Sequence, residues 1–561
     1  MPLSKRPDFV VNTNADGQFA PAITALPNGR FFVAWESGVY GTDNTVVRGR
    51  LFEASGVPIF DDFVISTSSG IGKHAPSLTT LADGSFVAAW QAYEGISPGF
   101  DVRGRLFNDN GIALGTDFVI NGTTAERQFN PVIAARASGG FIAAWTSEEG
   151  RSLSPDIRGR LFNVSGSAAG ADFVINSTTG LSQSGAAIAV LKGGGIIVAW
   201  TSEVGDDREL TVRGRVLKAN GTALGPDFII NETVPDGQSS PAITALASGG
   251  FVATWNSDVG GAGYDVRGRV FKSDGKATGR EFVISNTTSD DQFSPTIAAL
   301  ADGRFIAAWA SVESGTSQVD IRARLFNANG AAAGDDFIVN STLADNQRDP
   351  TVTVLTNGRI AIAWEDDSAA APKSEIRATI VNPNIFVGTT EEDAWSGGKG
   401  KDTLNGGGGK DTLKGNSGDD VINGGTGDDS LNGGAGADTL NGGTGKDKLT
   451  GGDGKDKLTG SVGADKFIYT TVKQGGDRIS DFKGNDFLVF DDVAFAHTGL
   501  GKARFTSQLD DHKATGTKAQ FIFDQSTDQL WFDSNGTKPG GATMMADLNN
   551  FNLQSGDILI V

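Results

Sequence analysis

Several residue types that carry chemistry are rare or missing in this sequence. It contains no cysteine and only three histidines, His74, His497 and His512, among 561 residues. Disulfide bonds and thiolate chemistry are therefore excluded, and stability outside a cell would have to come from packing and metal ions. The sequence also lacks HExxH, a G-x-S-x-G nucleophile elbow and a phosphate-binding loop, so the common sites for hydrolysis and nucleotide binding are not expected.

Long apolar segments and an excess of positive charge are absent as well. No stretch approaches the roughly 18 apolar residues of a membrane-spanning helix. The first residues, MPLSKRPDFVVN, lack the apolar core of an ordinary secretory signal. The net charge of −20 argues against binding to nucleic acid or to anionic membrane surfaces.

Glycine, by contrast, is abundant, and much of it lies in one segment. From Gly397 to Ile468, eight nonapeptides follow one another without a gap in the form Gly-Gly-x-Gly-x-Asp-x-apolar-x. Glycine allows positive φ and exposes carbonyl oxygens, and the aspartate adds a carboxylate, so each repeat offers the oxygen ligands that calcium prefers. The three residues after the aspartate would form a short strand with the middle, apolar side chain pointing inward. The pattern predicts a calcium-binding parallel β-helix.

The predicted metal ligands are the recurring aspartates and the glycines at the second and fourth positions of the repeat. The aspartates are Asp402, Asp411, Asp420, Asp429, Asp438, Asp447, Asp456 and Asp465. The glycines are Gly398, Gly400, Gly407, Gly409, Gly418, Gly425, Gly427, Gly434, Gly436, Gly443, Gly445, Gly452, Gly454 and Gly463.

This segment resembles the RTX (repeat-in-toxin) family of calcium-binding proteins. The resemblance implies a right-handed β-roll with two nonapeptides per coil, so that alternate aspartates, starting at Asp402 and at Asp411, line its two edges. Neighbouring aspartates on an edge would share one ion, which gives on the order of six Ca²⁺. Asn416 and Ser461 replace the second glycine, and nine lysines accompany eleven aspartates in residues 397–468. We therefore expect weaker sites than a more acidic roll would have.

A longer repeat fills the chain up to about Asn384. Seven tryptophans recur every 54 or 55 residues, each at the end of an apolar run such as FFVAW: Trp35, Trp90, Trp145, Trp200, Trp255, Trp309 and Trp364. A second apolar run and a hairpin turn precede each tryptophan, and [VI]R[GA]R and DFV[VI]N motifs or close variants follow it. Seven units of four short strands predict a seven-bladed β-propeller.

The phase of this repeat indicates how the ring closes. The chain begins at a fourth-strand motif, Asp8 to Asn12, and the seventh unit stops after its third-strand motif, Ile376 to Thr379. The N-terminal strand would therefore complete the last blade and remove an exposed edge. A linear stack of four-stranded units is the alternative. The fold prediction is thus all-β: a seven-bladed β-propeller in residues 1–384, the RTX β-roll in 385–468 and a β-rich cap with a secretion signal in 469–561.

Residues that recur once per blade are expected to have structural roles. The tryptophans should pack blade on blade, and the arginines of the third strand should pair with the acids that open the fourth. A recurring glutamine, such as Gln18, forms either a polar ring at the channel mouth or, as we favour, a cap on the loop backbone.

A binding face is expected on the side of the longer, variable loops that follow the tryptophans. Glu148, Glu149, Asp206 and Asp207 lie in these loops and leave a paired-carboxylate hydrolase open. No blade carries a polar cluster that the others lack, so we expect binding rather than catalysis and assign no catalytic residue.

The C-terminal end carries a second resemblance. Residues 476–490 resemble the segment that caps the roll in secreted RTX proteins, including the C-terminal domain of serralysin-type proteases. Two further segments, Gln520–Asp524 and Gln529–Gly536, read as a hairpin. The last residues, Asp557, Ile558, Leu559, Ile560 and Val561, resemble the uncleaved signal of type I secretion substrates. The alternative is an ordinary final β-strand. The same segment can serve as the signal during export and form a strand outside the cell.

Together these features predict a calcium-binding protein that the type I secretion machinery of a Gram-negative bacterium exports, either secreted or attached to the cell surface. We expect its propeller to bind a polysaccharide or a cell-surface ligand, in adhesion or matrix formation. An enzyme that degrades extracellular polysaccharide and a purely structural matrix protein are the alternatives.

Overall fold

The structure is a computed structural model of the chain. It describes residues 3–39, 44–67, 71–93, 99–123, 126–148, 154–205, 209–232, 237–258, 263–286, 290–313, 318–343, 345–367, 374–495, 505–508, 520–534, 541–549 and 551–561. Two compact units emerge. The propeller unit is Lys5–Ala332 with Asp336–Asn382, and the roll unit is Pro383–Val561 with Met1–Ser4 and Ala333–Asp335. Among the described residues, no helix is long and apolar enough to cross a membrane.

The propeller unit contains six separate four-stranded antiparallel sheets, or blades, and a seventh blade that belongs to a larger sheet. Blade 1 consists of β3 (Gly17–Ala25), β4 (Phe31–Gly38), β5 (Val46–Phe52) and β6 (Phe63–Val64). Blade 2 consists of β7 (Ile71–Thr80), β8 (Phe86–Tyr93), β9 (Phe100–Phe107) and β10 (Phe118–Val119). Blade 3 consists of β11 (Gln128–Ala135), β12 (Phe141–Ser147), β13 (Asp156–Phe162) and β14 (Phe173–Val174). Blade 4 consists of β15 (Gln183–Val190), β16 (Ile196–Val204), β17 (Glu209–Leu217) and β18 (Phe228–Ile229). Blade 5 consists of β19 (Gln238–Ala245), β20 (Phe251–Asp258), β21 (Tyr264–Phe271) and β22 (Phe282–Val283). Blade 6 consists of β23 (Gln292–Ala299), β24 (Phe305–Val312), β25 (Val319–Phe326) and β26 (Phe337–Ile338).

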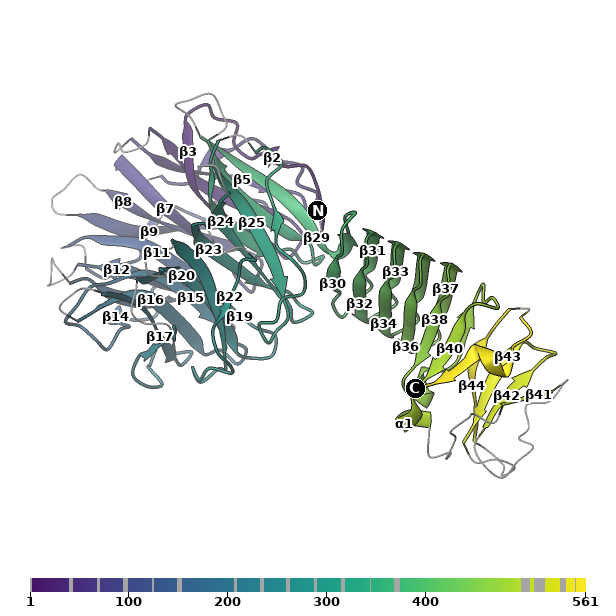
Figure 1. Ribbon diagram of the computed structural model, residues 1–561. Helices are drawn as coiled ribbons and strands as arrows, with labels where there is room; N and C mark the ends of the chain where they lie inside the picture. Colours follow the sequence, from purple (N-terminus) through teal and green to yellow (C-terminus); the bar gives the residue numbers. More distant parts are fainter. Residues whose placement is uncertain are drawn as a thin grey trace. The chain divides into compact units, whose positions relative to one another are not determined.

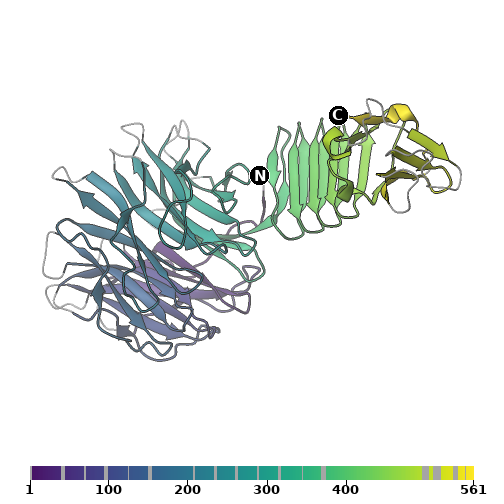
Figure 2. The ribbon, with the colours of Figure 1, turned by 90° about the horizontal axis from the view of Figure 1, so that it is seen from below.

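The seventh blade joins the two ends of the propeller sequence. It consists of β27 (Gln347–Val354), β28 (Ile360–Asp366), the first part of β29 (Glu375–Val387) and the N-terminal strand β2 (Phe9–Val10). Strand β2 pairs with β29 through Phe9↔Ala378 and Val10↔Arg377. The short strand β1 (Leu3–Lys5) also pairs with β29. The predicted seven-bladed propeller with closure by the N-terminal strand is therefore confirmed, and Figures 1 and 2 show its blades arranged in a ring.

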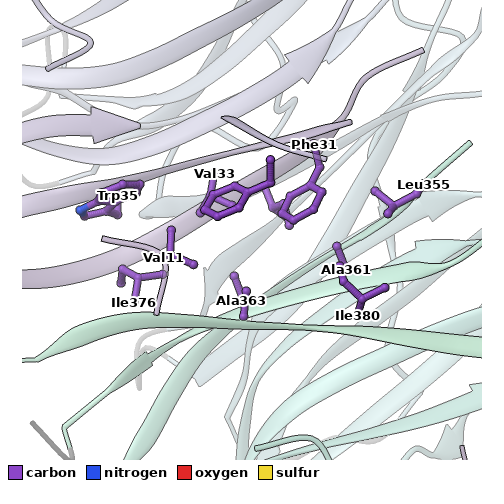
Figure 3. Close-up of a cluster of buried hydrophobic side chains, with 12 residues drawn as sticks. Val11, Phe31, Val33, Trp35, Leu355, Ala361, Ala363, Ile376 and Ile380 are labelled. Atoms are coloured by element: carbon purple, nitrogen blue, oxygen red, sulfur yellow. The ribbon is translucent and has the colours of Figure 1, made fainter. Parts of the chain in front are cut away.

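Apolar side chains fill the spaces between neighbouring blades. Between blades 7 and 1, Trp35 and Phe31 face Ala361, Ala363 and Ile380 (Figure 3). All seven tryptophans are fully buried, and covering such a large side chain stabilises the folded state by about 1.5–3 kcal/mol. The expected role of the tryptophans in blade packing is confirmed.

The roll unit is a parallel coil with one strand from each nonapeptide. One sheet stacks β31 (Thr403–Gly408), β33 (Val421–Thr426), β35 (Thr439–Thr444) and β37 (Lys457–Val462), after the end of β29. The other stacks β30 (Ala394–Ser396), β32 (Thr412–Ser417), β34 (Ser430–Ala435), β36 (Lys448–Asp453) and β38 (Lys466–Tyr469). Partners such as Leu404 and Ile422 are 18 residues apart, so each coil uses two repeats (Figure 1).

The strands of the roll are longer than the sequence pattern predicts. Strands β31 to β37 each span six residues and continue into the first three positions of the next repeat, because pairing resumes at the second position of that repeat, as in Gly407↔Gly425. The apolar residue of each repeat points inward as expected, and Leu404 to Phe467 in this series are at most 1% exposed. A core of single-file apolar side chains thus runs the length of the roll.

Both sheets of the roll continue into the C-terminal residues. Strands β39 (Asp477–Ile479) and β44 (Ala542–Asp547) extend one sheet, which continues with β43 (Gln529–Asp533), β42 (Gln520–Asp524) and β41 (Phe505–Gln508). Strands β40 (Phe487–Phe490) and β45 (Ile558–Ile560) extend the other. Two 3-10 turns, Val472–Gln474 and Ser555–Asp557, and the short helix α1 (Asp492–Phe495) complete the unit. The predicted hairpin is β42–β43.

Candidate functional site

The aspartates of the nonapeptides form two buried rows at the turns of the roll. All eight are at most 3% exposed. In the first six repeats, the backbone N–H of the aspartate donates to Oδ1 of the aspartate 18 residues later, as from Asp402 to Asp420 at 2.8 Å and from Asp411 to Asp429 at 2.8 Å. The expected division into two edges is therefore what the structure shows, with successive coils tied together through one oxygen of each carboxylate.

Glycine is favoured at three positions of the turn for two different reasons. In most turns the second and fourth positions have positive φ, for example +111° at Gly425 and +127° at Gly427, where a side chain is strained. Asn416 and Ser461 occupy the second position with φ of 77° and 70°, so the roll keeps the same conformation there. At the first position the limit is space, because a Cβ on Gly424 would collide with Oδ2 of Asp429 and meet the carbonyl oxygen of Gly442.

The other carboxylate oxygen of most of these aspartates is free to bind a ligand. In Asp411, Asp420, Asp429, Asp438, Asp447, Asp456 and Asp465, Oδ2 is buried and has no hydrogen-bond partner among the described residues. In Asp411, Asp420, Asp429 and Asp438 this oxygen lies beside the first glycine of its own turn, where a glycine carbonyl oxygen of the next coil is also close. A buried anionic oxygen without a donor is costly, and carboxylate and carbonyl oxygens are the ligands of Ca²⁺. The turns therefore fit calcium held between coils by carboxylates and main-chain carbonyls.

Burial makes these carboxylates hard to ionise without a cation. Desolvation, reinforced by neighbouring carboxylates one coil away, raises the pKa of Asp438 and Asp447 to about 7. It raises the pKa of Asp429 and Asp465 to about 6. A divalent ion beside Oδ2 would favour the ionised form, so calcium binding and deprotonation are coupled. Within the described residues, no group of three or more carboxylate or imidazole side chains is placed to hold a metal ion.

The structure adds aspartates that the sequence pattern missed. The backbone N–H of Asp456 donates to Asp477 Oδ1, and that of Asp465 donates to Asp486 Oδ1, both at 3.0 Å. These partners continue the two rows beyond the last nonapeptide at a spacing of 21 residues instead of 18. At the other end, the N–H of Asp393 donates to Asp411 Oδ1. Both aspartates stand in the Asp-x-apolar pattern of the repeat, as Asp477-Arg478-Ile479 and Asp486-Phe487-Leu488, and this pattern could have identified them.

The predicted secretion signal lies at the last strand. Ile558 to Ile560 form β45, which pairs in parallel with β40 through Leu488↔Ile558 and Phe490↔Ile560. Asp557 belongs to the preceding 3-10 turn. The segment is a folded strand in this structure, and a role in export stays a prediction.

In the propeller unit, the recurring polar residues hold the blades together. Each third-strand arginine lies 2.5–3.5 Å from the acid that opens the fourth strand, in all seven blades. The acid also accepts backbone N–H groups from the preceding blade, as Asp227 does from Ser177. In six blades the tryptophan Nε1–H donates to the glutamine Oε1 at 2.5–3.2 Å. In four of them Nε2 caps the carbonyl two residues earlier, as favoured from the sequence.

One group of polar residues breaks the symmetry of the ring. Glu36 and Glu365 follow the tryptophans of blades 1 and 7, where other blades have Gln, Thr, Asn or Ala. Glu36 Oε1 accepts the N–H of Ala75 at 2.7 Å, and Oε2 lies 2.8 Å from Nδ1 of His74. Glu365 is 7% exposed, and burial, together with Asp349 and Asp367, raises its pKa to about 8.

Asp349 interacts electrostatically with both of these glutamates. Desolvation, with a contribution from Glu36, raises the pKa of Asp349, and Asp349 in turn raises that of Glu365. The expectation concerned single blades and did not cover this group, because blades 7, 1 and 2 form it together. The signal was present in the residue after each tryptophan. Of the acids named from the variable loops, Glu149, Asp206 and Asp207 lie outside the described residues, and Glu148 lies 3.6 Å from Arg127.

These observations define an all-β protein in which a closed propeller precedes a parallel β-roll. The family model of the RTX calcium-binding nonapeptide repeat (four copies) matches residues 396–431 and again 432–467. Residues 396–467 are therefore RTX repeats, as the resemblance implied. No curated protein sequence matches the chain.

Solved structures similar to this chain have low sequence identity to it. A Dyadobacter fermentans protein of unknown function is 12% identical over 68% of this chain and 99% of its own, with a TM-score of 0.44. An α-L-arabinanase of Penicillium chrysogenum, complexed with arabinobiose, is 10% identical over 68% and 98%, with a TM-score of 0.42. A mutant of the NanB sialidase of Streptococcus pneumoniae is 9% identical over 68% and 71%, with a TM-score of 0.40.

Proposed function

We propose that this chain is a calcium-binding protein exported by type I secretion, and that its propeller is a non-catalytic binding module for a polysaccharide or another surface ligand. The observation that supports the calcium role most directly is the row of buried Oδ2 atoms without hydrogen-bond donors among the described residues, found in seven of the eight nonapeptides. Low calcium in the cytosol would leave the roll unfolded for export, and higher calcium outside would fold it.

A calcium titration of the full chain tests the first part. Isothermal calorimetry should report on the order of six ions per chain. Circular dichroism should show strand content rising with calcium, since the roll can fold only when its buried carboxylates are neutralised. Magnesium, which prefers six-coordinate geometry with retained water, should substitute poorly. A roll that is fully folded after chelation, with no calcium uptake, would rule out the proposal.

Export can be tested in a Gram-negative host that carries a type I secretion system. Removal of residues 540–561 should leave the protein inside the cell. Continued export of the shortened chain would count against a C-terminal signal. Removal of the propeller alone should leave export intact.

The cluster of Glu36, Asp349 and Glu365 supports a second candidate, an enzyme that degrades an extracellular polysaccharide. Glu365 would hold a proton at neutral pH because its pKa is about 8, while Glu36 is paired with His74. Two carboxyl groups in unlike environments are the arrangement of a general acid and its partner. Release of reducing ends from a glycan, abolished in Glu365→Gln, would favour the enzyme. Glycan binding without release would favour the binding module.

A further inference from the structure

The side of the propeller that carries the short hairpin turns contains a cavity at blades 4 to 6. Its volume is about 800 Å³, within the range of sites for small organic ligands. Turns of three blades border it, including Lys192, Ser248, Lys272 and Asn329. This is the side opposite the variable loops, where the sequence alone placed the binding face.

The turn residue beside the cavity differs from blade to blade. In blade 1 the turn residue before Phe31 is Arg30, whose guanidinium donates to Asn110 of the next blade at 2.9 Å. In blade 5 the same position is Gly250, and the counterpart of Asn110 is Asn329. Both Gly250 and Asn329 line the cavity. Glycine also stands at this position in blades 3 and 4, as Gly140 and Gly195, so the arginine bridge between blades 1 and 2 is not a feature of every blade, and the turn of blade 5 does not carry it.

The residues around this opening are hydrogen-bond donors and cations. The residues that line it include Lys192, Lys272, Ser248, Ser273 and Asn329, and none of the lining residues is an aspartate or a glutamate. Lys192, Lys272 and both serines are exposed, whereas Phe271 and Val270 beneath them are buried. In a chain with a net charge of −20, this region is a local positive site that can concentrate an anionic ligand.

We propose that this cavity, formed by Lys192, Ser248, Gly250, Lys272, Ser273 and Asn329, binds an acidic saccharide, with the two lysines on its carboxylate or sulfate groups. The proposal rests on the binding-module function proposed above and names its ligand class and site. Hydroxyl and amide groups beside the lysines hydrogen-bond the sugar hydroxyls, and the volume admits more than a single inorganic anion.

The test measures binding of the full, calcium-loaded chain to short oligogalacturonate, to its methyl ester and to inorganic phosphate. Oligogalacturonate should bind, its affinity should fall as salt is added, and the uncharged ester and phosphate should bind much more weakly. The double variant Lys192→Glu/Lys272→Glu should lose roughly tenfold or more in affinity, since each reversal replaces an attraction with a repulsion. Each variant should melt at the wild-type temperature, because both lysines are exposed.

Lys218→Glu is the matched control. Lys218 occupies in blade 4 the turn position that Lys272 occupies in blade 5, is exposed, and does not line the cavity. It should change the affinity for oligogalacturonate by less than about twofold. An equal loss in the control, or no loss in the double variant, would overturn the assignment of the cavity.

The outcomes also separate this inference from the function on which it rests. Binding of a neutral glycan that the lysine variants do not affect would overturn the cavity site and leave the binding module standing. Phosphate binding as tight as that of the saccharide would overturn the ligand class. Absence of binding to all charged and neutral glycans would overturn both proposals.

Discussion

At the scale of single residues, the propeller shows what one departure from the repeat costs. In blades 2, 3 and 6 an asparagine after the fourth strand donates to an acid of the third strand, as Asn340 does to Asp320 at 2.7 Å. Blade 5 has Ser285 at this position. Asp265 Oδ1, Ser285 Oγ and Ser257 Oγ are all buried there without hydrogen-bond partners among the described residues. Burial accordingly raises the pKa of Asp265.

We expect Ser285→Asn to stabilise the propeller. The amide would supply the missing donor to Asp265, and a hydrogen bond to a buried carboxylate is worth about 1–3 kcal/mol. A thermal melt should show a higher Tm than the wild type. The double variant Ser285→Asn/Asp265→Ala should lose this gain. An unchanged Tm in the single variant would show that a water molecule already satisfies these groups.

Glu365 should make the stability of the propeller depend on pH. Its folded pKa of about 8 lies above the unfolded value near 4.5, so the folded state holds the proton over this range and the unfolded state does not. Stability therefore falls as pH rises from about 4.5 to about 8, by an amount on the order of a few kcal/mol. We expect Glu365→Gln to flatten this fall.

The measurement is Tm against pH for the wild type and the variant. The two curves should separate progressively toward pH 8, with the glutamine variant the more stable. Glu209→Gln, at an exposed strand position, should follow the wild-type curve. Parallel curves for the wild type and Glu365→Gln would show that Glu365 is ionised in the folded protein below neutral pH.

At the scale of elements, most turns of the roll use the two oxygens of their aspartate differently. One oxygen accepts a backbone hydrogen bond, and the other has no hydrogen-bond donor among the described residues. Asp447 accepts the N–H of Asp429 through Oδ1 at 2.9 Å, while its Oδ2 has no partner in the described part of the chain. Asparagine can keep the first contact and replaces the second oxygen with an N–H donor. The substitution therefore separates the two roles.

We expect Asp447→Asn to have opposite effects with and without calcium. Without calcium, a neutral amide avoids burying an unpaired carboxylate, so the variant should form at least as much folded roll as the wild type. With calcium, the loss of an anionic ligand should lower the Tm and reduce the number of bound ions by about one to two. Thermal melts in calcium and in chelator, with calorimetric titration, provide the comparison.

Thr444→Ala is the control in the same coil, since Thr444 is exposed at the third position of the repeat. It should change neither the melt in chelator nor the number of ions. Destabilisation of Asp447→Asn by the same amount in both conditions would mean that the carboxylate has only a structural role.

Much of both units could be predicted from the sequence because their periods are short and regular. A nonapeptide with one apolar position fixes which residue points inward, so the series from Leu404 to Phe467 followed directly. Asp477 and Asp486 were missed because the chain inserts three residues there, and a 21-residue spacing breaks the pattern while the backbone pairing continues.

The polar cluster of Glu36, Asp349 and Glu365 was missed for a different reason. Its members come from the two ends of the propeller sequence and become neighbours only because blade 7 packs against blade 1. When the repeat units are compared one by one, the acids of blade 1 and blade 7 are not recognised as neighbours. The cavity beside Gly250 was also not predicted, because the turn residue before the second strand varies among arginine, serine and glycine around the ring, and the sequence does not show which turns leave space.

At the scale of the whole molecule, the ring of the propeller is closed by strand β2, which pairs with β29. Strand β2 contributes only two residues to the seventh blade, and Asp8 beside it lies 3.5 Å from Arg377 and accepts the N–H of Ser341 at 2.9 Å. Asp172 makes the same two contacts inside the ring, with Arg158 at 3.2 Å and the N–H of Gly122 at 3.0 Å. The two aspartates differ mainly in the chain on either side of them.

That difference makes Asp8 and Asp172 a matched pair for ring closure. Asp172→Asn should cost about 1–3 kcal/mol, the loss of charge-assisted hydrogen bonds in a segment that the chain holds in place on both sides. Asp8→Asn removes equivalent bonds from a terminal strand, so β2 should detach and expose an edge of blade 7. Hydrogen exchange at Val10 and Val11 should rise strongly in Asp8→Asn and remain at the wild-type rate in Asp172→Asn, and the Tm of the propeller should fall further in the former. Equal exchange and equal Tm would mean that the apolar contacts of Phe9 and Val11 with the neighbouring blades hold the ring closed without the ion pair.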